Sequence, residues 1–153
     1  MLLPFVLKSL NGIDKEHLVS EILELNNESR QYGLVLTPQN VVQILEARNR
    51  SLRQLGRIEL GFEVSKTIIH NFCNSSYITP EEYVPVLSEL HDIFYYMKNE
   101  TEDKIGDDEL IQMMKDYFEN SCGGSLELLK GKLVSFAEDF RKKTKLQALP
   151  EED

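Results

Sequence analysis

The sequence predicts an all-α fold, a single domain of five or six helices packed as an irregular or orthogonal bundle. Apolar residues recur at spacings of three and four along most of the chain, which is the period of a helix. Prolines, glycines and capping residues stand where these periodic stretches begin and end, and no convincing strand interrupts them. We therefore expect one helical domain over residues 1–147 and a flexible acidic tail at 148–153.

The first residues, 1–13, are apolar but contain Pro4 and Lys8, so we expect a short helix or arm docked on the body. They lack the basic start and the cleavage site of a signal peptide. Their apolar run is also far shorter than the roughly 20 residues that span a bilayer. Residues 14–29 are predicted to form the first main helix, which Gly33 ends.

Two helices are predicted in the next part of the chain. Thr37 as the N-cap and Pro38 at the first helical position begin a helix that stops before Gly56. A connector at 57–60 follows, and a shorter helix occupies 61–74.

The stretch 78–101 carries the clearest helix start and the longest apolar stripe. Thr79 is an N-cap residue, Pro80 suits the first helical position, and Glu82 has the spacing of a capping box. Pro85 removes one backbone hydrogen bond inside this helix, so we expect a bend near its start. The apolar stripe steps by 4, 3, 4 and 3 through Tyr83, Leu87, Leu90, Phe94 and Met97.

Two further helices complete the predicted bundle. One covers 107–118, where acidic residues at its start suit the helix dipole. Gly123 and Gly124 separate it from a last helix that Ser125 caps. The inner face of that helix is predicted to carry Leu129, Leu133, Phe136 and Phe140.

Tyr95 and Tyr96 are adjacent on the predicted helix 78–101, so their side chains point in different directions. Both cannot face the core. We expect one of them to lie at a boundary between helices or between subunits, with its hydroxyl hydrogen-bonded or in water. The pair is therefore our candidate for an interface.

Charge and cysteine content restrict the partners and the compartment. The formal net charge of −9 opposes non-specific binding to nucleic acid or to an anionic membrane, so we expect neither partner. The two cysteines, Cys73 and Cys122, occur in a chain large enough to fold without disulfides. We interpret them as reduced thiols and predict a cytoplasmic protein.

Four of the six arginines fall within ten residues, and they are the candidate binding residues: Arg48, Arg50, Arg53 and Arg57. Arg50, Arg53 and Arg57 step by three and four, which predicts one helix face. Such a cluster can bind a phosphate, a carboxylate or an acidic partner. The competing interpretation is that the arginines pair with the protein's own acids, which are dense at 100–120.

A metal site has only weak support in the sequence. His70 and Cys73 are three residues apart on a predicted helix, and Cys122 with His91 or His17 could complete a ligand set. No paired CxxC, HExxH or Glu-x-x-His motif accompanies them. A buried cysteine more often packs as a small apolar residue. We therefore expect no metal and no cofactor.

Motifs of known enzyme classes are also missing. The chain has no GxSxG nucleophile motif, and Gly123-Gly124-Ser125 lacks the GK[ST] of a phosphate-binding loop. No local sequence supports a Cys–His nucleophile pair. These absences favour a protein that is not an enzyme.

Several phrases together resemble a family of small bacterial proteins described only as a domain of unknown function. They are LTPQNVVQILEARNRSL, GRIELG, NFCNSSYI, IFYYMKNET, DDELIQMMKDYF and GSLELL. The resemblance covers roughly residues 15 to 140. It implies a bacterial cytoplasmic protein and supplies no activity, so no catalytic residue is carried over.

Two functional hypotheses follow from the sequence. The first is a non-enzymatic interaction or regulatory module of the bacterial cytoplasm, whose partner is a second copy of the chain or another protein. The alternative is a protein that binds, or acts on, a small anionic ligand through the helix face from Arg48 to Arg57.

Overall fold

The computed structural model describes residues 12–148, and within this range the chain is helical with no strand. The six helices of ten residues or more are α2 (Gly12–Leu23), α4 (Pro38–Gln54), α5 (Glu63–Phe72), α6 (Tyr83–Glu100), α7 (Asp107–Glu119) and α8 (Leu126–Ala148). Three short turns join them, α3 (Asn26–Ser29), η1 (Arg30–Tyr32) and η2 (Pro80–Glu82). The predicted all-α domain is confirmed. Most of the predicted arm at 1–13, and the tail beyond Ala148, lie outside the described residues.

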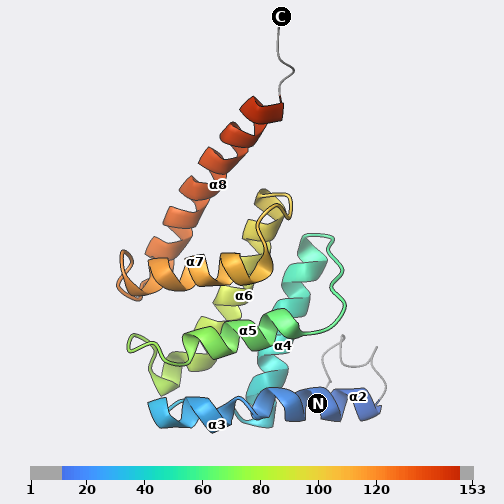
Figure 1. Ribbon diagram of the computed structural model, residues 1–153. Coiled ribbons are helices and arrows are strands. Elements are labelled where there is room, and N and C mark those ends of the chain that lie inside the picture. Colours follow the sequence, from blue (N-terminus) through green and yellow to red (C-terminus); the bar gives the residue numbers. More distant parts are fainter. Residues whose placement is uncertain (1–11, 149–153) are drawn as a thin grey trace, which may run out of the picture.

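The helices are arranged in two crossed sets. α4 and α6 lie side by side and form the most extensive helix pair, while α2, α5 and α7 run across them (Figure 1). α8 packs against α6 and α7, and its C-terminal half extends away from the other helices (Figure 1). The arrangement agrees with the predicted irregular or orthogonal bundle.

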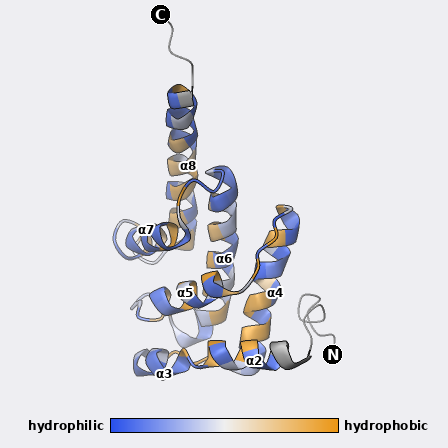
Figure 2. Cartoon of the chain, turned by 45° about the vertical axis from the view of Figure 1, so that its right-hand side comes forward, coloured by the Kyte–Doolittle hydropathy of each residue, from blue (hydrophilic) through white to orange (hydrophobic). Residues whose placement is uncertain are grey.

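The core lies where the apolar faces of these helices meet. Each helix carries both hydrophobic and hydrophilic residues, as expected when one face is buried and the other is in water (Figure 2). The predicted stripe of α6 is buried throughout, from Tyr83 to Met97. Leu129 and Leu133 of α8 are buried as well, whereas Phe136 and Phe140 are half-buried and stack on each other.

The two predicted proline-containing helix starts differ in the structure. At α4 the Thr37 hydroxyl accepts a hydrogen bond from the Asn40 N–H, and the Asn40 side chain accepts one from the Thr37 N–H. Thr79 caps nothing, because residues Pro80–Glu82 form a 3₁₀ turn and α6 begins only at Tyr83. The predicted capping box at Thr79 is therefore wrong.

The later start of α6 changes the interpretation of Pro85. This proline is the third residue of the helix, where its missing N–H would have had no partner within the helix. The expected loss of a helical hydrogen bond inside the element does not occur. Because α6 begins at Tyr83, the physical reason for the predicted bend is removed.

The predicted helix at 14–29 is also divided. α2 ends at Leu23, and the chain continues as the short turns α3 and η1 up to Gly33. The Asn26 side chain explains the break, because it accepts a hydrogen bond from the Leu36 N–H at 2.8 Å and donates one to the Leu36 carbonyl at 2.9 Å. These bonds fasten the turn to the segment before α4 and compete with a continuous helix.

Candidate functional site

The connection between α4 and α5 presents two apolar side chains to water. We call residues 56–61 the anchored loop. It is bracketed by Gly56 and Gly61, whose φ angles of 66° and 85° lie in the left-handed region that glycine tolerates. Between them Arg57 and Glu59 are half-buried, whereas Ile58 and Leu60 are 92% and 93% exposed. The alternation is that of an extended chain with one side turned toward the protein.

The inner attachment of the anchored loop is the buried guanidinium of Arg48. Arg48 is 2% exposed, and its Nε and Nη2 atoms donate to Oε1 of Glu59 at 3.2 and 3.0 Å. Its Nη2 also donates to the backbone carbonyls of Glu59 and Gly61, at 3.2 and 2.8 Å. The guanidinium stacks over the ring of Phe62 at 4.2 Å from the ring centre. One side chain of α4 thus fixes the second half of the loop.

Tyr95 of α6 completes this inner attachment. Its hydroxyl donates to Oε1 of Glu59 at 2.6 Å, so the carboxylate is held by Arg48 and Tyr95 together. Burial, followed by the hydrogen bond to the Glu59 carboxylate, raises the pKa of Tyr95 well above its ordinary value. The phenol therefore remains a donor at neutral pH. We call Arg48, Glu59 and Tyr95 the inner anchor.

The outer anchor joins Arg57 to Asp103, in the turn after α6. The two Nη atoms of Arg57 donate to the two carboxylate oxygens of Asp103 at 3.1 and 2.5 Å, a bidentate pair. This hydrogen bonding lowers the pKa of Asp103 and raises that of Arg57. Glu102 and Asp103 have φ angles of 54° and 59°, and the Asp103 N–H bonds the Lys98 carbonyl at 2.8 Å. The turn thereby directs the carboxylate of Asp103 toward the loop.

The structure does not place the four candidate arginines on one face. α4 ends at Gln54, so Arg57 lies in the loop beyond it, and Arg48 points into the core. Arg50 and Arg53 are exposed on α4. The predicted Arg50–Arg53–Arg57 helix face is therefore wrong. Pairing with the acids of 100–120 is found for Arg57, through Asp103.

A signal for the buried arginine was present in the sequence. Arg48 lies in register with three buried apolar residues of α4, Val41, Leu45 and Leu52, at spacings of 4, 3 and 4. An arginine within an apolar stripe indicates a buried cation with an internal partner. The loop residues Ile58 and Leu60 were missed because a connector has no period against which an exposed apolar residue stands out.

The two adjacent tyrosines take opposite environments, as predicted. Tyr95 is buried in the inner anchor, and Tyr96 is 37% exposed. Tyr96 lines a shallow, mainly apolar groove between α6 and α8 with Ile93, Leu133 and Val134. Whether the groove is an interface stays a prediction.

A serine and a histidine lie within hydrogen-bond distance in the core, as in a nucleophile–base pair. The ring of His91 places Nε2 2.8 Å from the Ser65 hydroxyl and Nδ1 2.7 Å from the Leu87 carbonyl. Because a carbonyl only accepts, Nδ1 carries the proton and Nε2 accepts from Ser65. Both residues are fully buried, and burial lowers the pKa of His91 to about 4. A neutral pair without access to solvent is structural.

The candidate metal ligands are not brought together. His70 is exposed and lies 3.3 Å from a carboxylate oxygen of Glu28, whereas the buried Cys73 thiol donates to the His70 carbonyl at 3.3 Å. Burial raises the pKa of the Cys73 thiol. Across residues 12–148, no group of three His, Cys, Asp or Glu side chains is placed to hold a metal ion.

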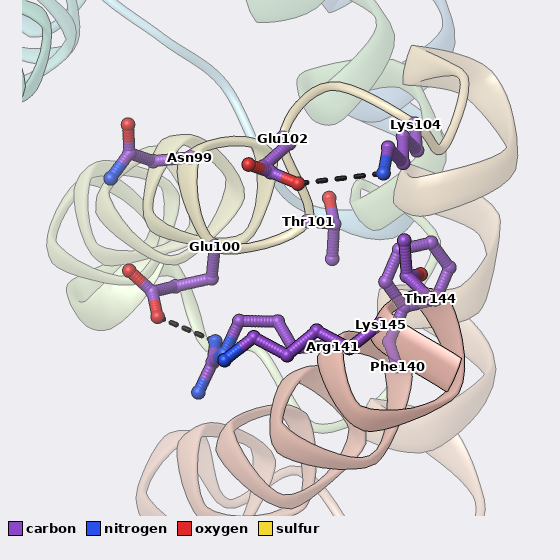
Figure 3. A pocket seen from close by; sticks show the side chains of 9 residues that line it. All are labelled: Asn99, Glu100, Thr101, Glu102, Lys104, Phe140, Arg141, Thr144 and Lys145. Atoms are coloured by element: carbon purple, nitrogen blue, oxygen red, sulfur yellow. Dashed lines mark hydrogen bonds and ion pairs between the residues drawn. The ribbon is translucent and has the colours of Figure 1, made fainter. Parts of the chain in front are cut away.

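A second hollow lies between the end of α6 and the last turns of α8 (Figure 3). Arg141 points toward Glu100, with 2.6 Å between nitrogen and oxygen, and Lys104 points toward Glu102 at 3.4 Å (Figure 3). The pocket is lined by three basic side chains, Lys104, Arg141 and Lys145. The first two are thus paired with acidic side chains of the same pocket. This pocket lacks the concentrated positive charge that an anionic ligand requires.

Comparison with known proteins identifies the family. The model of a family of unknown function, DUF6323, matches residues 21–146, so the chain belongs to that family. The resemblance to a domain of unknown function is thereby confirmed. No curated protein and no solved structure matches the chain. In the part of the chain that the structure describes, no helix has both the length and the apolarity needed to cross a membrane.

Proposed function

We propose that this chain is a non-enzymatic interaction module of the bacterial cytoplasm, and that its protein partner binds the exposed side chains of Ile58 and Leu60. The observation that carries this proposal is the exposure of two aliphatic side chains at alternate positions, 92% and 93%, on a loop fixed from both ends. Burying an isoleucine or a leucine contributes about 1.5–3 kcal/mol. The anchors hold both side chains in water, where that contribution is lost until a partner covers them.

Other features support a binding role over catalysis. The one Ser–His pair is fully buried, and both cysteine thiols are buried and unbridged among the described residues. Reduced thiols and the acidic composition favour the cytoplasm. The partner is another protein or a second copy of the chain, and sedimentation of the purified protein over a range of concentrations separates these two cases.

The experiment is affinity capture from a lysate of the source bacterium with three forms of the protein. The wild type is compared with the double variant Ile58→Ser/Leu60→Ser. The matched control is Leu128→Ser/Leu146→Ser, which removes two exposed leucines from α8. We expect a protein that is retained by the wild type and the control and lost from the loop variant. If all three forms retain the same proteins, the loop is not the binding surface.

The alternative, an anionic ligand, depends mainly on the exposed Arg50, because the guanidinium groups of Arg48 and Arg57 are held by carboxylates. Melting temperatures measured with inorganic phosphate, pyrophosphate and nucleotides test it. A rise that is lost in Arg50→Ala would favour this alternative over the protein partner. Unchanged melting with all of these ligands would remove it.

A further inference from the structure

We infer that the anchored loop binds its partner by strand addition: an extended peptide with alternating apolar side chains and acidic flanks pairs its backbone with Ile58 and Leu60. The inference rests on the proposed function and specifies how the partner is held. Peptides are known to add to exposed strand edges in this way, with affinity from backbone hydrogen bonds and specificity from alternate side chains.

The backbone hydrogen bonds of the loop show which of its edges is open. The Arg57 N–H donates to the Leu52 carbonyl at 2.8 Å, and the Glu59 and Gly61 carbonyls accept from Arg48 at 3.2 and 2.8 Å. In an extended chain the backbone groups of alternate residues point to the same edge. Within the extended segment, residues 57 and 59 therefore turn their backbone groups toward the protein, and the carbonyl of Gly61, just beyond it, is bonded on the same side.

The groups of Ile58 and Leu60 then point to the opposite edge. Among residues 12–148, no hydrogen bond joins the N–H or C=O of either residue to another part of the protein. Two residues that face the same edge offer two donors and two acceptors. These four groups match an antiparallel strand with hydrogen-bonded pairs at both residues.

The size of the patch favours a peptide over a folded partner surface or a second copy. A stable interface between folded proteins buries about 800 Å² on each partner, far more than two aliphatic side chains provide. The left-handed glycines at 56 and 61 also limit the extended segment to the four residues between them. A single short strand of the partner fits this length.

Local charge indicates the chemistry of the peptide's flanks. The chain carries −9 overall, yet residues 38–57 hold one acid and four arginines, of which Arg48 and Arg57 are matched by Glu59 and Asp103. Arg50 is exposed on the last turns of α4, which lead directly into the loop. Acidic residues beside the apolar core of the peptide complement this charge.

The test begins with a displayed library of random peptides of about ten residues, the upper length of ordinary strands. Peptides selected on the wild-type protein are synthesised, and their dissociation constants are measured for three variants. Ile58→Ser/Leu60→Ser removes the apolar side chains. Leu60→Pro removes the outward N–H, and Leu60→Ala is its matched control because it keeps that N–H. Circular dichroism and thermal melting check that each variant is folded.

We expect the selected peptides to share apolar residues at alternate positions and acidic flanks. Leu60→Pro should weaken binding at least tenfold beyond the loss in Leu60→Ala. A second measurement uses only the wild-type protein, so it does not require any variant to fold. Hydrogen exchange of the Ile58 and Leu60 amides should slow at least tenfold when the peptide saturates the protein.

Three outcomes overturn the inference, and they separate it from the proposed function. In the first outcome, peptide binding is lost in Ile58→Ser/Leu60→Ser, the two amides stay unprotected, and Leu60→Pro binds the peptide as tightly as Leu60→Ala. Ile58 and Leu60 then form the binding surface, but the peptide does not bind by strand addition. If no selected peptide requires Ile58 or Leu60 for binding, both the proposed function and strand addition are wrong. If the protein forms a concentration-dependent dimer that Leu60→Pro abolishes, the occupant is a second copy and not a separate peptide.

Discussion

The two anchors of the loop use the same chemical pair in different surroundings. In the inner anchor the Arg48 guanidinium is 2% exposed and Glu59 22%, whereas in the outer anchor Arg57 is 22% exposed and Asp103 52%. The inner pair adds Tyr95, Phe62 and two backbone carbonyls as partners. The outer pair lies closer to water, and beside it the Lys98 ammonium approaches the Asp103 carboxylate, at 3.9 Å.

The comparison indicates that burial, and not the pairing itself, decides how much an arginine contributes to the stability of the fold. A buried charge whose partner is removed remains in a medium that cannot solvate it. An exposed charge whose partner is removed is solvated by water and screened by salt. We therefore expect the inner anchor to determine stability and the outer anchor to determine mainly the position of the loop.

The largest expected effect is that of Arg48→Ala. It leaves the partly buried Glu59 carboxylate without its cation and should lower the free energy of unfolding by about 3–5 kcal/mol. Chemical denaturation measures this change. Arg50→Ala, on the exposed side of the same helix, is the control and should stay within about 0.5 kcal/mol of wild type. A loss below about 1 kcal/mol for Arg48→Ala, the range of an exposed salt bridge, would mean that burial does not separate the anchors.

The second-largest effect is expected from low pH, which should destabilise the fold through His91, in the core near the inner anchor. Burial, with a smaller contribution from the Arg48 charge, lowers its pKa to about 4, while the unfolded chain keeps a value near 6.5. The unfolded state therefore binds more protons between these values. Stability should be complete above pH 6.5 and fall toward pH 4, with a slope approaching about 1.4 kcal/mol per pH unit.

Urea denaturation at a series of pH values checks this slope. His91→Gln serves as the comparison, because its stability should vary less over the same window whatever its value at neutral pH. The outer anchor predicts a different window: the pKa of Asp103 is lowered, so its contribution is present above the ordinary carboxylate range and is lost only at lower pH. If stability falls with pH equally steeply in wild type and in His91→Gln, the pH dependence between 6.5 and 4 does not come from His91.

Tyr95→Phe should have a smaller effect on the inner anchor. It removes one hydrogen bond to the Glu59 carboxylate, which keeps its two bonds from Arg48. A hydrogen bond to a charged group contributes about 1.5–3 kcal/mol, and we expect the lower end because the acceptor stays paired. Thermal melting provides the measurement, with Tyr96→Phe as the matched variant at an exposed site. Similar losses in both variants would show that Glu59 does not need the phenol.

The smallest effect is expected for Arg57→Ala. Its pair with the half-exposed Asp103 is screened by solvent, so the loss should be about 0–1 kcal/mol and should shrink further at high salt. Amide exchange at Ile58 is the sharper measurement, because the loop should become more mobile while the fold keeps its stability. A loss comparable to that of Arg48→Ala would erase the distinction between the two anchors.

The helices were predictable because their burial is encoded locally. Leu87, Leu90 and Phe94 follow the helical period, and all three are buried. The capping rule failed where a side-chain hydrogen bond replaced the expected bond to a backbone N–H. At Thr79 the hydroxyl donates to the Glu82 carboxylate at 3.2 Å and does not cap a backbone N–H, whereas Asn40 completes the box at Thr37.

The site was only partly predictable. The arginine cluster drew attention to the correct region, but Arg48 and Arg50 lie two residues apart, about 200° around a helix, and so face opposite sides. Their partners come from elsewhere: Glu59 lies in a connector, and Asp103 is 46 residues from Arg57. Such pairings depend on how the helices cross, which no local pattern in one sequence specifies.

The attachment of residues 57, 59 and 61 has a consequence for the speed of recognition. Ordering the backbone of a single residue requires about 1–2 kcal/mol of conformational entropy, and here that loss occurs during folding. A partner thus meets a pre-organised edge and need not wait for the loop to settle. Weakening either attachment should slow association even where every side chain that touches the partner is unchanged.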